Sequence, residues 1–208
     1  MPLYVLALTD SPVDLRDVGD RQLHLVSMGG VHVVCQRRSD APRASEAELR
    51  AQHALVLELA GRVRAILPAR FGTLLEAAEV RRVVRTHRDE IRQALDLVRD
   101  RVQVTIRVTG RRPPASAARP ASGRAYLEAK RRAEIPRLPK PVAAVLGSVA
   151  HLAVHERREP GAGPLLATVY HLVPVEDIPR YMPLVARRPR SMTVTGPWPP
   201  FAFTPRFA

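Results

Sequence analysis

The amino-acid sequence predicts an α+β fold in two domains: a first domain with helices on one face of an antiparallel sheet, and a smaller α+β second domain. Three observations predict this fold. Residues 101–109 alternate strictly between apolar and polar side chains, as a strand does. Two helical stripes that begin with capping residues precede this strand. Residues 110–122 form a Pro/Ala/Ser/Arg stretch without periodicity, which we interpret as a linker between domain 1–109 and domain 123–208.

Three strands are expected near the N-terminus. Residues 3–8 form an apolar run that indicates the first strand. Residues 23–26 and 31–35 predict two more, joined by a hairpin in which Gly29-Gly30 supplies the positive φ of a tight turn. Alternatively, residues 23–26 belong to a longer loop. Cys35, the only cysteine, lies in the third strand, where we expect a buried and unreactive thiol.

Two capping boxes place the helices of the first domain. Ser45 with Glu48 is expected to cap the first helix, and Thr73 with Glu76 the second. The first apolar stripe ends before Pro68, and it comprises Leu49, Val56, Leu59, Val63 and Ile66. The second stripe runs from Val80 to Val98 and is either continuous or broken near Thr86.

The strand at 101–109 is the clearest in the chain. Its apolar side chains, Val102, Val104, Ile106 and Val108, are expected to face a core. The intervening Gln103, Thr105 and Arg107 are expected to face outward.

The sequence of the second domain predicts alternating helices and strands. A short helix is expected at 123–131 and an amphipathic helix at 142–152. The nearly continuous apolar run 165–173 predicts a central strand. Pro174 is a suitable first residue for a helix whose inward positions are Ile178, Tyr181, Met182 and Val185. Residues 191–195 predict a last strand.

The C-terminal segment is unusual because it is both aromatic and rich in proline. It contains Gly196, Pro197, Trp198, Pro199, Pro200, Phe201 and Phe203, and Trp198 is the only tryptophan. Three prolines exclude a regular helix or a central strand, so we expect an extended segment. Burying one such ring contributes roughly 1.5–3 kcal/mol, so the segment should be packed back against the protein. It either fills a groove of its own domain or forms part of a partner surface.

Charge and motifs exclude several classes of protein. The net charge of +13 indicates an acidic partner, and a basic nucleic-acid-binding module is the alternative function that it raises. The arginines are scattered, however, and no zinc-finger spacing or basic aromatic strand is present. His151 and His155 are spaced for one helix face, but no third metal ligand is apparent. We therefore expect no catalytic site, no metal, no cofactor, no nucleic acid and no membrane span, in a cytoplasmic protein that is not an enzyme.

Two stretches resemble a known family. The run Leu67-Pro68-Ala69-Arg70-Phe71-Gly72-Thr73 and the C-terminal run from Thr195 to Phe203 are similar to the signatures of the gas vesicle protein GvpL/GvpF family. Shorter echoes at 3–5, 123–127 and 170–173 fall in the expected order, so the resemblance spans almost the whole chain. The sequence departs from the family pattern at Gln103, where glutamate is common, and at His171, where an apolar residue is usual.

The resemblance implies both a fold and a role. The first domain would be a modified ferredoxin-like fold. The protein would be a non-enzymatic accessory protein of gas vesicle assembly, located at the vesicle or in the cytoplasm, whose partners are the small hydrophobic shell protein and other accessory proteins. Our hypothesis is that an apolar groove flanked by arginines binds the shell protein. The two signatures, which include Arg70, Phe71, Gly72 and Thr73, are expected either to clamp the domains together or to contact the partner. In the clamp, Arg70 would hydrogen-bond to carbonyl groups of the C-terminal segment or stack on one of its rings.

Overall fold

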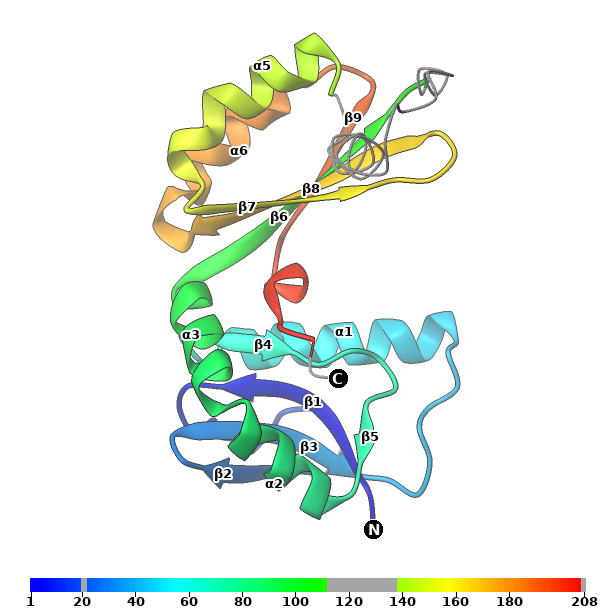
Figure 1. Cartoon of the computed structure of the whole chain (residues 1–208), viewed down its shortest axis with the longest axis vertical. Helices are drawn as coiled ribbons and strands as arrows, with labels where there is room; N and C mark the ends of the chain where they lie inside the picture. Colours follow the sequence, from blue (N-terminus) through cyan, green and yellow to red (C-terminus); the bar gives the residue numbers. More distant parts are fainter. Residues whose placement is uncertain (20–21, 112–137, 207–208) are drawn as a thin grey trace, which may run out of the picture. The chain divides into compact units, whose positions relative to one another are not determined.

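The computed structural model describes residues 1–19, 22–111 and 138–206 (Figure 1). The chain forms two compact units. The first unit comprises Met1–Val102 and Trp198–Ala208, and the second comprises Gln103–Pro197. The chain therefore passes from the first unit into the second and returns to the first at its C-terminus.

An antiparallel sheet forms the centre of the first unit. Its strands are β1 (Leu3–Thr9), β2 (Leu23–Met28), β3 (Val31–Arg37), β4 (Ile66–Pro68) and β5 (Leu74–Leu75). The order is β2-β3-β1-β4, and β5 also pairs with β1. This is the strand order of a ferredoxin-like sheet. The fold is modified because turns, and no helix, follow β1 in the described part of residues 10–22. The predicted hairpin is confirmed, with Gly29 and Gly30 both at positive φ.

Helices cover both faces of this sheet. Helix α1 (Glu46–Ala60) packs its Val56 and Leu59 against one face, which carries Tyr4 and Leu6. Helix α2 (Ala77–Thr86) lies with Val80 and Val84 by the opposite face, which carries Val5 and Val33. Helix α3 (Arg88–Val98) follows α2. Successive strand residues point to opposite faces, so Tyr4 and Val5 mark different faces. The expectation of helices on one face only is thus corrected.

The capping predictions have mixed outcomes. Ser45 caps α1 by accepting a hydrogen bond from the Glu48 amide at 3.2 Å, as predicted. Helix α1 ends at Ala60, however, and Leu49 is 47% exposed, so the predicted stripe to Ile66 is wrong. The reason is that residues 66–68 pair with β1 as β4.

The N-cap of the second helix lies three residues later than predicted, at Glu76 and not at Thr73. Glu76 is the N-cap of α2, and its amide donates to the Glu79 carboxylate at 2.9 Å. The Thr73 hydroxyl instead donates to the Arg70 carbonyl oxygen at 2.8 Å. The break near Thr86 is confirmed, because His87 separates α2 from α3.

Among its described residues, the second unit packs α-helices α5 (Lys140–Val149) and α6 (Ile178–Ala186) on a four-stranded sheet. Its strands are β6 (Arg101–Thr109), β7 (His155–Pro160), β8 (Leu165–Pro174) and β9 (Met192–Trp198), in the order β7-β8-β6-β9. Helices α5 and α6 lie side by side and share one core with β6 and β8 (Figure 1). Short 3-10 turns at Ala150–Leu152 and Val175–Asp177 adjoin these helices. The central position of β8 and the last strand are confirmed. The charged strand β7 was not predicted.

In strand β6, polar side chains are buried as well as apolar ones. Val104, Ile106 and Val108 lie in the core, as predicted. Gln103 and Thr105 were expected to face solvent, but they are only 4% and 8% exposed. The Gln103 amide donates to the Thr105 hydroxyl at 2.9 Å, so the two buried polar side chains contact each other.

The units differ from the predicted domains at both of their boundaries. Strand β6 was assigned to domain 1–109, but most of it belongs to the second unit, because its apolar side chains pack with α5 and α6. The segment after Pro197 was assigned to domain 123–208, but it belongs to the first unit. Most of the predicted linker 110–122 and the whole predicted helix 123–131 lie outside the described residues.

A hydrogen-bonded triad links β8, β7 and α6 in the second unit, with His171 and Tyr181 buried and Glu156 exposed. His171 is 1% exposed, and its Nδ1 lies 2.7 Å from the Tyr181 hydroxyl while its Nε2 lies 2.9 Å from the Glu156 carboxylate. Burial lowers the pKa of His171, and this effect outweighs the opposite influence of Glu156. Burial also raises the pKa of Tyr181, as does the charge of Glu156. Burial raises the pKa of Glu156, but hydrogen bonds from Arg158 and His171 leave it below its usual value.

Acidic pH is therefore expected to destabilise the second unit. His171 has a lowered pKa in the folded state, so the unfolded chain binds more protons as the pH falls below 6.5, the ordinary value. Glu156 adds to the loss once the pH falls below 4.5. Urea unfolding at about pH 7.5 and about pH 5.5 should show a lower midpoint at the acidic pH. His171→Leu should flatten this dependence, whereas exposed His151→Gln should not. An equal slope in wild type and His171→Leu would contradict the assignment.

Candidate functional site

The first signature forms a turn inserted into the edge of the first sheet. Strands β4 and β5 both pair with β1, at Ala7↔Pro68 and Tyr4↔Leu74. Between them, the Ala69 amide donates to the Leu6 carbonyl at 2.8 Å, and the Val5 amide donates to the Thr73 carbonyl at 2.9 Å. The residues Arg70–Thr73, which we call the signature turn, therefore leave the sheet edge and return to it. Gly72 adopts a φ of +83° in this turn.

Tyr4 holds the signature turn against α1. Its hydroxyl donates to the buried Gln52 side chain and accepts from the Gly72 amide at 3.3 Å. The Gln52 amide group donates in turn to the Ala69 carbonyl at 3.4 Å. The Tyr4 and Phe71 rings meet edge to face, with their centroids 6.5 Å apart. Phe71 and Gly72 thus have structural contacts that explain their place in the turn.

Gly72→Ala is expected to lower the free energy of unfolding by about 1–2 kcal/mol, the cost of a left-handed backbone for a residue with a Cβ atom. Strain is the only cause expected, because nothing lies within 4 Å of the added Cβ atom. Gly147→Ala is the matched control, since that site also has free space but lies inside helix α5. There the change should stabilise the protein by about 0.5–1 kcal/mol. Equal changes in the free energy of unfolding for Gly72→Ala and Gly147→Ala, measured by urea unfolding, would contradict the proposal that the positive φ of Gly72 requires glycine.

The C-terminal segment, Trp198–Arg206, packs onto the first unit. Phe203 is 8% exposed, Pro199 and Pro200 are buried, and the short 3-10 turn Phe201–Phe203 lies against β4. His53 of α1 contacts both Trp198, at 5.2 Å between ring centroids, and Phe201, at 5.6 Å. The expectation of a wholly extended segment is corrected by the 3-10 turn. Gly196 and Pro197 belong to β9, which is an edge strand of the second sheet. This position agrees with the prediction that the proline-rich segment does not form a central strand.

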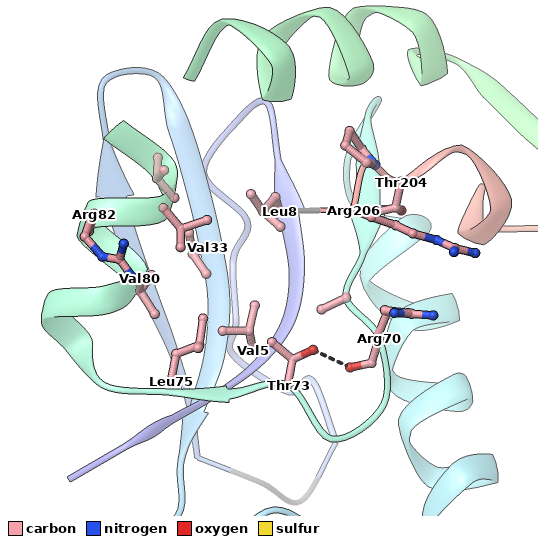
Figure 2. Close-up of a pocket in the computed structure, with 14 residues that line it drawn as sticks. Val5, Leu8, Val33, Arg70, Thr73, Leu75, Val80, Arg82, Thr204 and Arg206 are labelled. Atoms are coloured by element: carbon pink, nitrogen blue, oxygen red, sulfur yellow. Dashed lines mark hydrogen bonds between the residues drawn. The ribbon is translucent and has the colours of Figure 1, made fainter. Parts of the chain in front are cut away.

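A pocket of about 300 Å³ lies in the first unit beside both signatures (Figure 2). Val5, Leu8 and Val33 of the sheet and Val80, Val83 and Val84 of α2 provide its apolar lining. Ala69, Arg70 and Thr73 of the first signature region line it together with Thr204, Pro205 and Arg206 of the C-terminal segment. Sequence reasoning did not predict residues 204–206, because they follow the signature and carry no motif.

The pocket is basic as well as apolar. Arg70, Arg82 and Arg206 are exposed at its lining, and none of them forms an ion pair within the described residues. Its lining contains no aspartate or glutamate from the part of the chain that the structure describes. Arg70 was expected to hydrogen-bond or stack on the C-terminal segment, but its only hydrogen bonds among described residues are those its carbonyl oxygen accepts from Thr73. The arginine instead shares the pocket with that segment.

Metal and thiol chemistry find no support in the described residues. They contain no group of three potential metal ligands. His151 lies in a 3-10 turn and His155 in β7, so the helix that was expected to bring them onto one face does not exist. Cys35 is fully buried, and burial raises the pKa of its thiol, which disfavours the reactive thiolate. None of the helices in the described ranges has the length and apolar character that crossing a bilayer requires.

Comparison with known proteins identifies the family. The family model described as "Gas vesicle synthesis protein GvpL/GvpF" matches residues 2–205. The fold is similar to the crystal structure of gas vesicle protein GvpF from Microcystis aeruginosa, with a TM-score of 0.72, 12% identity and 99% of each chain covered. It is equally similar to GvpF from Anabaena sp. PCC7120, with a TM-score of 0.72, 14% identity, and 100% of this chain and 99% of that chain covered. No curated protein matches significantly. The chain belongs to the GvpL/GvpF family of gas vesicle synthesis proteins.

Proposed function

We propose that this chain is a non-enzymatic accessory protein of gas vesicle assembly that binds the small hydrophobic shell protein before it is built into the vesicle. Membership of the gas vesicle synthesis family supports the general role. The proposed binding of the shell protein rests on the pocket of the first unit. This pocket combines an aliphatic lining with three arginines that have no ion-pair partner among the described residues.

The physical need for such a protein follows from the shell itself. A subunit that presents an apolar face to gas exposes that face to water until assembly, and exposed apolar surface promotes aggregation. An accessory protein that covers part of this face lowers the concentration of free subunit and supports ordered nucleation. The pocket volume of about 300 Å³ lies at the lower end of the range for ligand sites, so it admits a few side chains. Such limited binding suits a partner that must later be released.

The two signatures have a structural role in this proposal. The signature turn and the C-terminal segment each form part of the pocket wall, so they shape the site. Phe203 is buried and therefore supports the wall from within. Phe201, at 36% exposure, is the ring of the segment that remains open to a partner. The protein would act in the cytoplasm or at the vesicle, together with other accessory proteins.

Co-expression with the shell protein of the same gene cluster tests this function. The tagged full-length chain should retain the shell protein in a pull-down at low salt and at high salt, because burial of apolar side chains is not screened. Val83→Glu, which places a carboxylate in the apolar lining, should abolish retention. Exposed Arg81→Glu on the same helix is the control that should retain it. Failure of the folded wild-type chain to retain soluble shell protein would overturn the proposal.

A further inference from the structure

The pocket arginines differ from many other arginines of the chain in their surroundings. Arg62 and Arg64 pair with Glu58 and Asp100, respectively, at the protein surface. Arg70, Arg82 and Arg206 have no such partner among the described residues, although all three side chains are exposed. Guanidinium groups gathered without a neighbouring carboxylate favour an anionic ligand, and they bind carboxylates through charge-assisted hydrogen bonds.

The three arginines come from different elements around the apolar lining. Arg82 lies on α2, Arg70 in the signature turn and Arg206 in the C-terminal segment. Figure 2 shows Arg82 on one side of the lining, and Arg70 and Arg206 on the other. A ligand with a single anionic head group would engage one of these sides. A ligand that carries negative groups on both sides of an apolar centre would engage both.

Thr204 adds a polar group within the pocket. Its hydroxyl oxygen has no hydrogen-bond partner among the described residues and is inaccessible to solvent, so it reaches the pocket that the residue lines only when the side chain rotates about its Cα–Cβ bond. A hydroxyl can donate one hydrogen bond and accept others, and a peptide backbone offers both kinds of partner. The hydrocarbon chain of a fatty acid offers neither, so Thr204 favours a peptide as the ligand.

We infer that the pocket binds an apolar peptide segment with carboxylates on both flanks. This inference rests on the proposed function, because it names the kind of shell-protein segment that would enter the site. The aliphatic lining takes the apolar centre of the segment. Arg82 binds the carboxylate on one side, and Arg70 and Arg206 bind the carboxylate on the other. Thr204 hydrogen-bonds the peptide backbone once rotation about its Cα–Cβ bond turns the hydroxyl toward the ligand.

Binding of defined peptides to the full-length chain tests the inference. The probe is a short dye-labelled peptide with a leucine- and valine-rich centre and glutamates at both ends, followed by fluorescence anisotropy. Replacing its glutamates with glutamines should weaken binding at least about tenfold, because charge-assisted hydrogen bonds are lost on both sides. The double variant Arg82→Gln/Arg206→Gln should weaken binding of the glutamate peptide similarly. The control Arg81→Gln/Arg188→Gln removes the same charge from exposed residues outside the pocket and should bind normally.

A variant that removes only the Thr204 hydroxyl separates the contribution of the backbone hydrogen bond to peptide binding from the contribution of the charged groups. Thr204→Val should weaken binding of both peptides and leave their ratio unchanged, because it removes only the proposed hydrogen bond to the peptide backbone. Equal binding of the glutamate and glutamine peptides would overturn the inference. So would decanoate binding that depends on Arg82 and Arg206 while the glutamate peptide fails to bind.

The same variants in the shell-protein pull-down keep this inference distinct from the proposed function. Retention of shell protein by Arg82→Gln/Arg206→Gln at the wild-type level would overturn the inference and leave the proposed function standing. Conversely, peptide binding that depends on these arginines without any shell-protein retention would support the ligand chemistry and overturn the shell protein as its source.

Discussion

Phe203→Ala is expected to lower the free energy of unfolding of the chain by about 3 kcal/mol. The reason is that the ring is 8% exposed, and its removal leaves a cavity under the C-terminal segment beside β4. Loss of this anchor should also release Thr204–Arg206 from the pocket wall, so binding of the shell protein should fall together with stability. Urea unfolding and the pull-down measure the two effects on the same protein.

Phe201→Ala provides the matched control, because the two phenylalanines belong to the same 3-10 turn. Phe201 is 36% exposed, so its truncation should cost less than about half as much as that of Phe203. A Phe203→Ala protein that unfolds at the wild-type urea concentration would show that the segment does not anchor there. A Phe201→Ala protein of full stability that no longer binds would instead assign this ring to the partner surface.

Tyr4→Phe is expected to lower the free energy of unfolding by about 2 kcal/mol. The hydroxyl of Tyr4 donates to Gln52, which is 7% exposed, and removing it leaves the buried Gln52 oxygen without this donor. The Gly72 amide also loses its acceptor, so the signature turn should become more mobile. Hydrogen exchange of the residue 69–73 amides, together with urea unfolding, measures both consequences.

The double variant Tyr4→Phe/Gln52→Leu should recover part of this loss, because removing both polar partners leaves no buried group unsatisfied. Tyr170→Phe is the control. Its hydroxyl lies 3.1 Å from the half-exposed Glu159 carboxylate, so its loss should cost under about 1 kcal/mol. A Tyr4→Phe effect no larger than that of Tyr170→Phe would mean that the phenol does not hold the turn.

Local sequence patterns correctly predicted the helices, strands and turns whose tertiary packing is consistent with their local secondary-structure propensity. The Gly29-Gly30 hairpin, the Ser45 cap and the existence of strand β6 are examples, because each depends on residues near one another in the chain. Where the prediction failed, pairing with a strand distant in the sequence determined the secondary structure. Residues 66–68 continue a helical stripe in the sequence, but they form β4 because β1 offers them an open edge. Strand β7 is highly charged, and its pairing with the apolar β8 leaves no local signal.

The candidate site was predictable only in part. The signatures identified the turn and the aromatic end of the chain, and the hypothesis of an apolar groove flanked by arginines remains the proposal. The individual arginines were not predictable, because Arg70, Arg82 and Arg206 come from three distant segments that only the fold brings to one pocket. Thr204 carries no motif at all. Its buried hydroxyl is visible only once the C-terminal segment is placed beside the signature turn.

Vesicle formation in cells shows whether assembly depends on the apolar pocket of this protein. In a host that carries the gas vesicle gene cluster without this gene, turbidity that collapses under pressure reports intact vesicles. The wild-type chain and Arg81→Glu should restore pressure-sensitive turbidity, whereas Val83→Glu, expressed at the same level, should not. Full restoration by Val83→Glu would show that vesicle assembly proceeds without the apolar pocket, and the proposed binding site would be wrong.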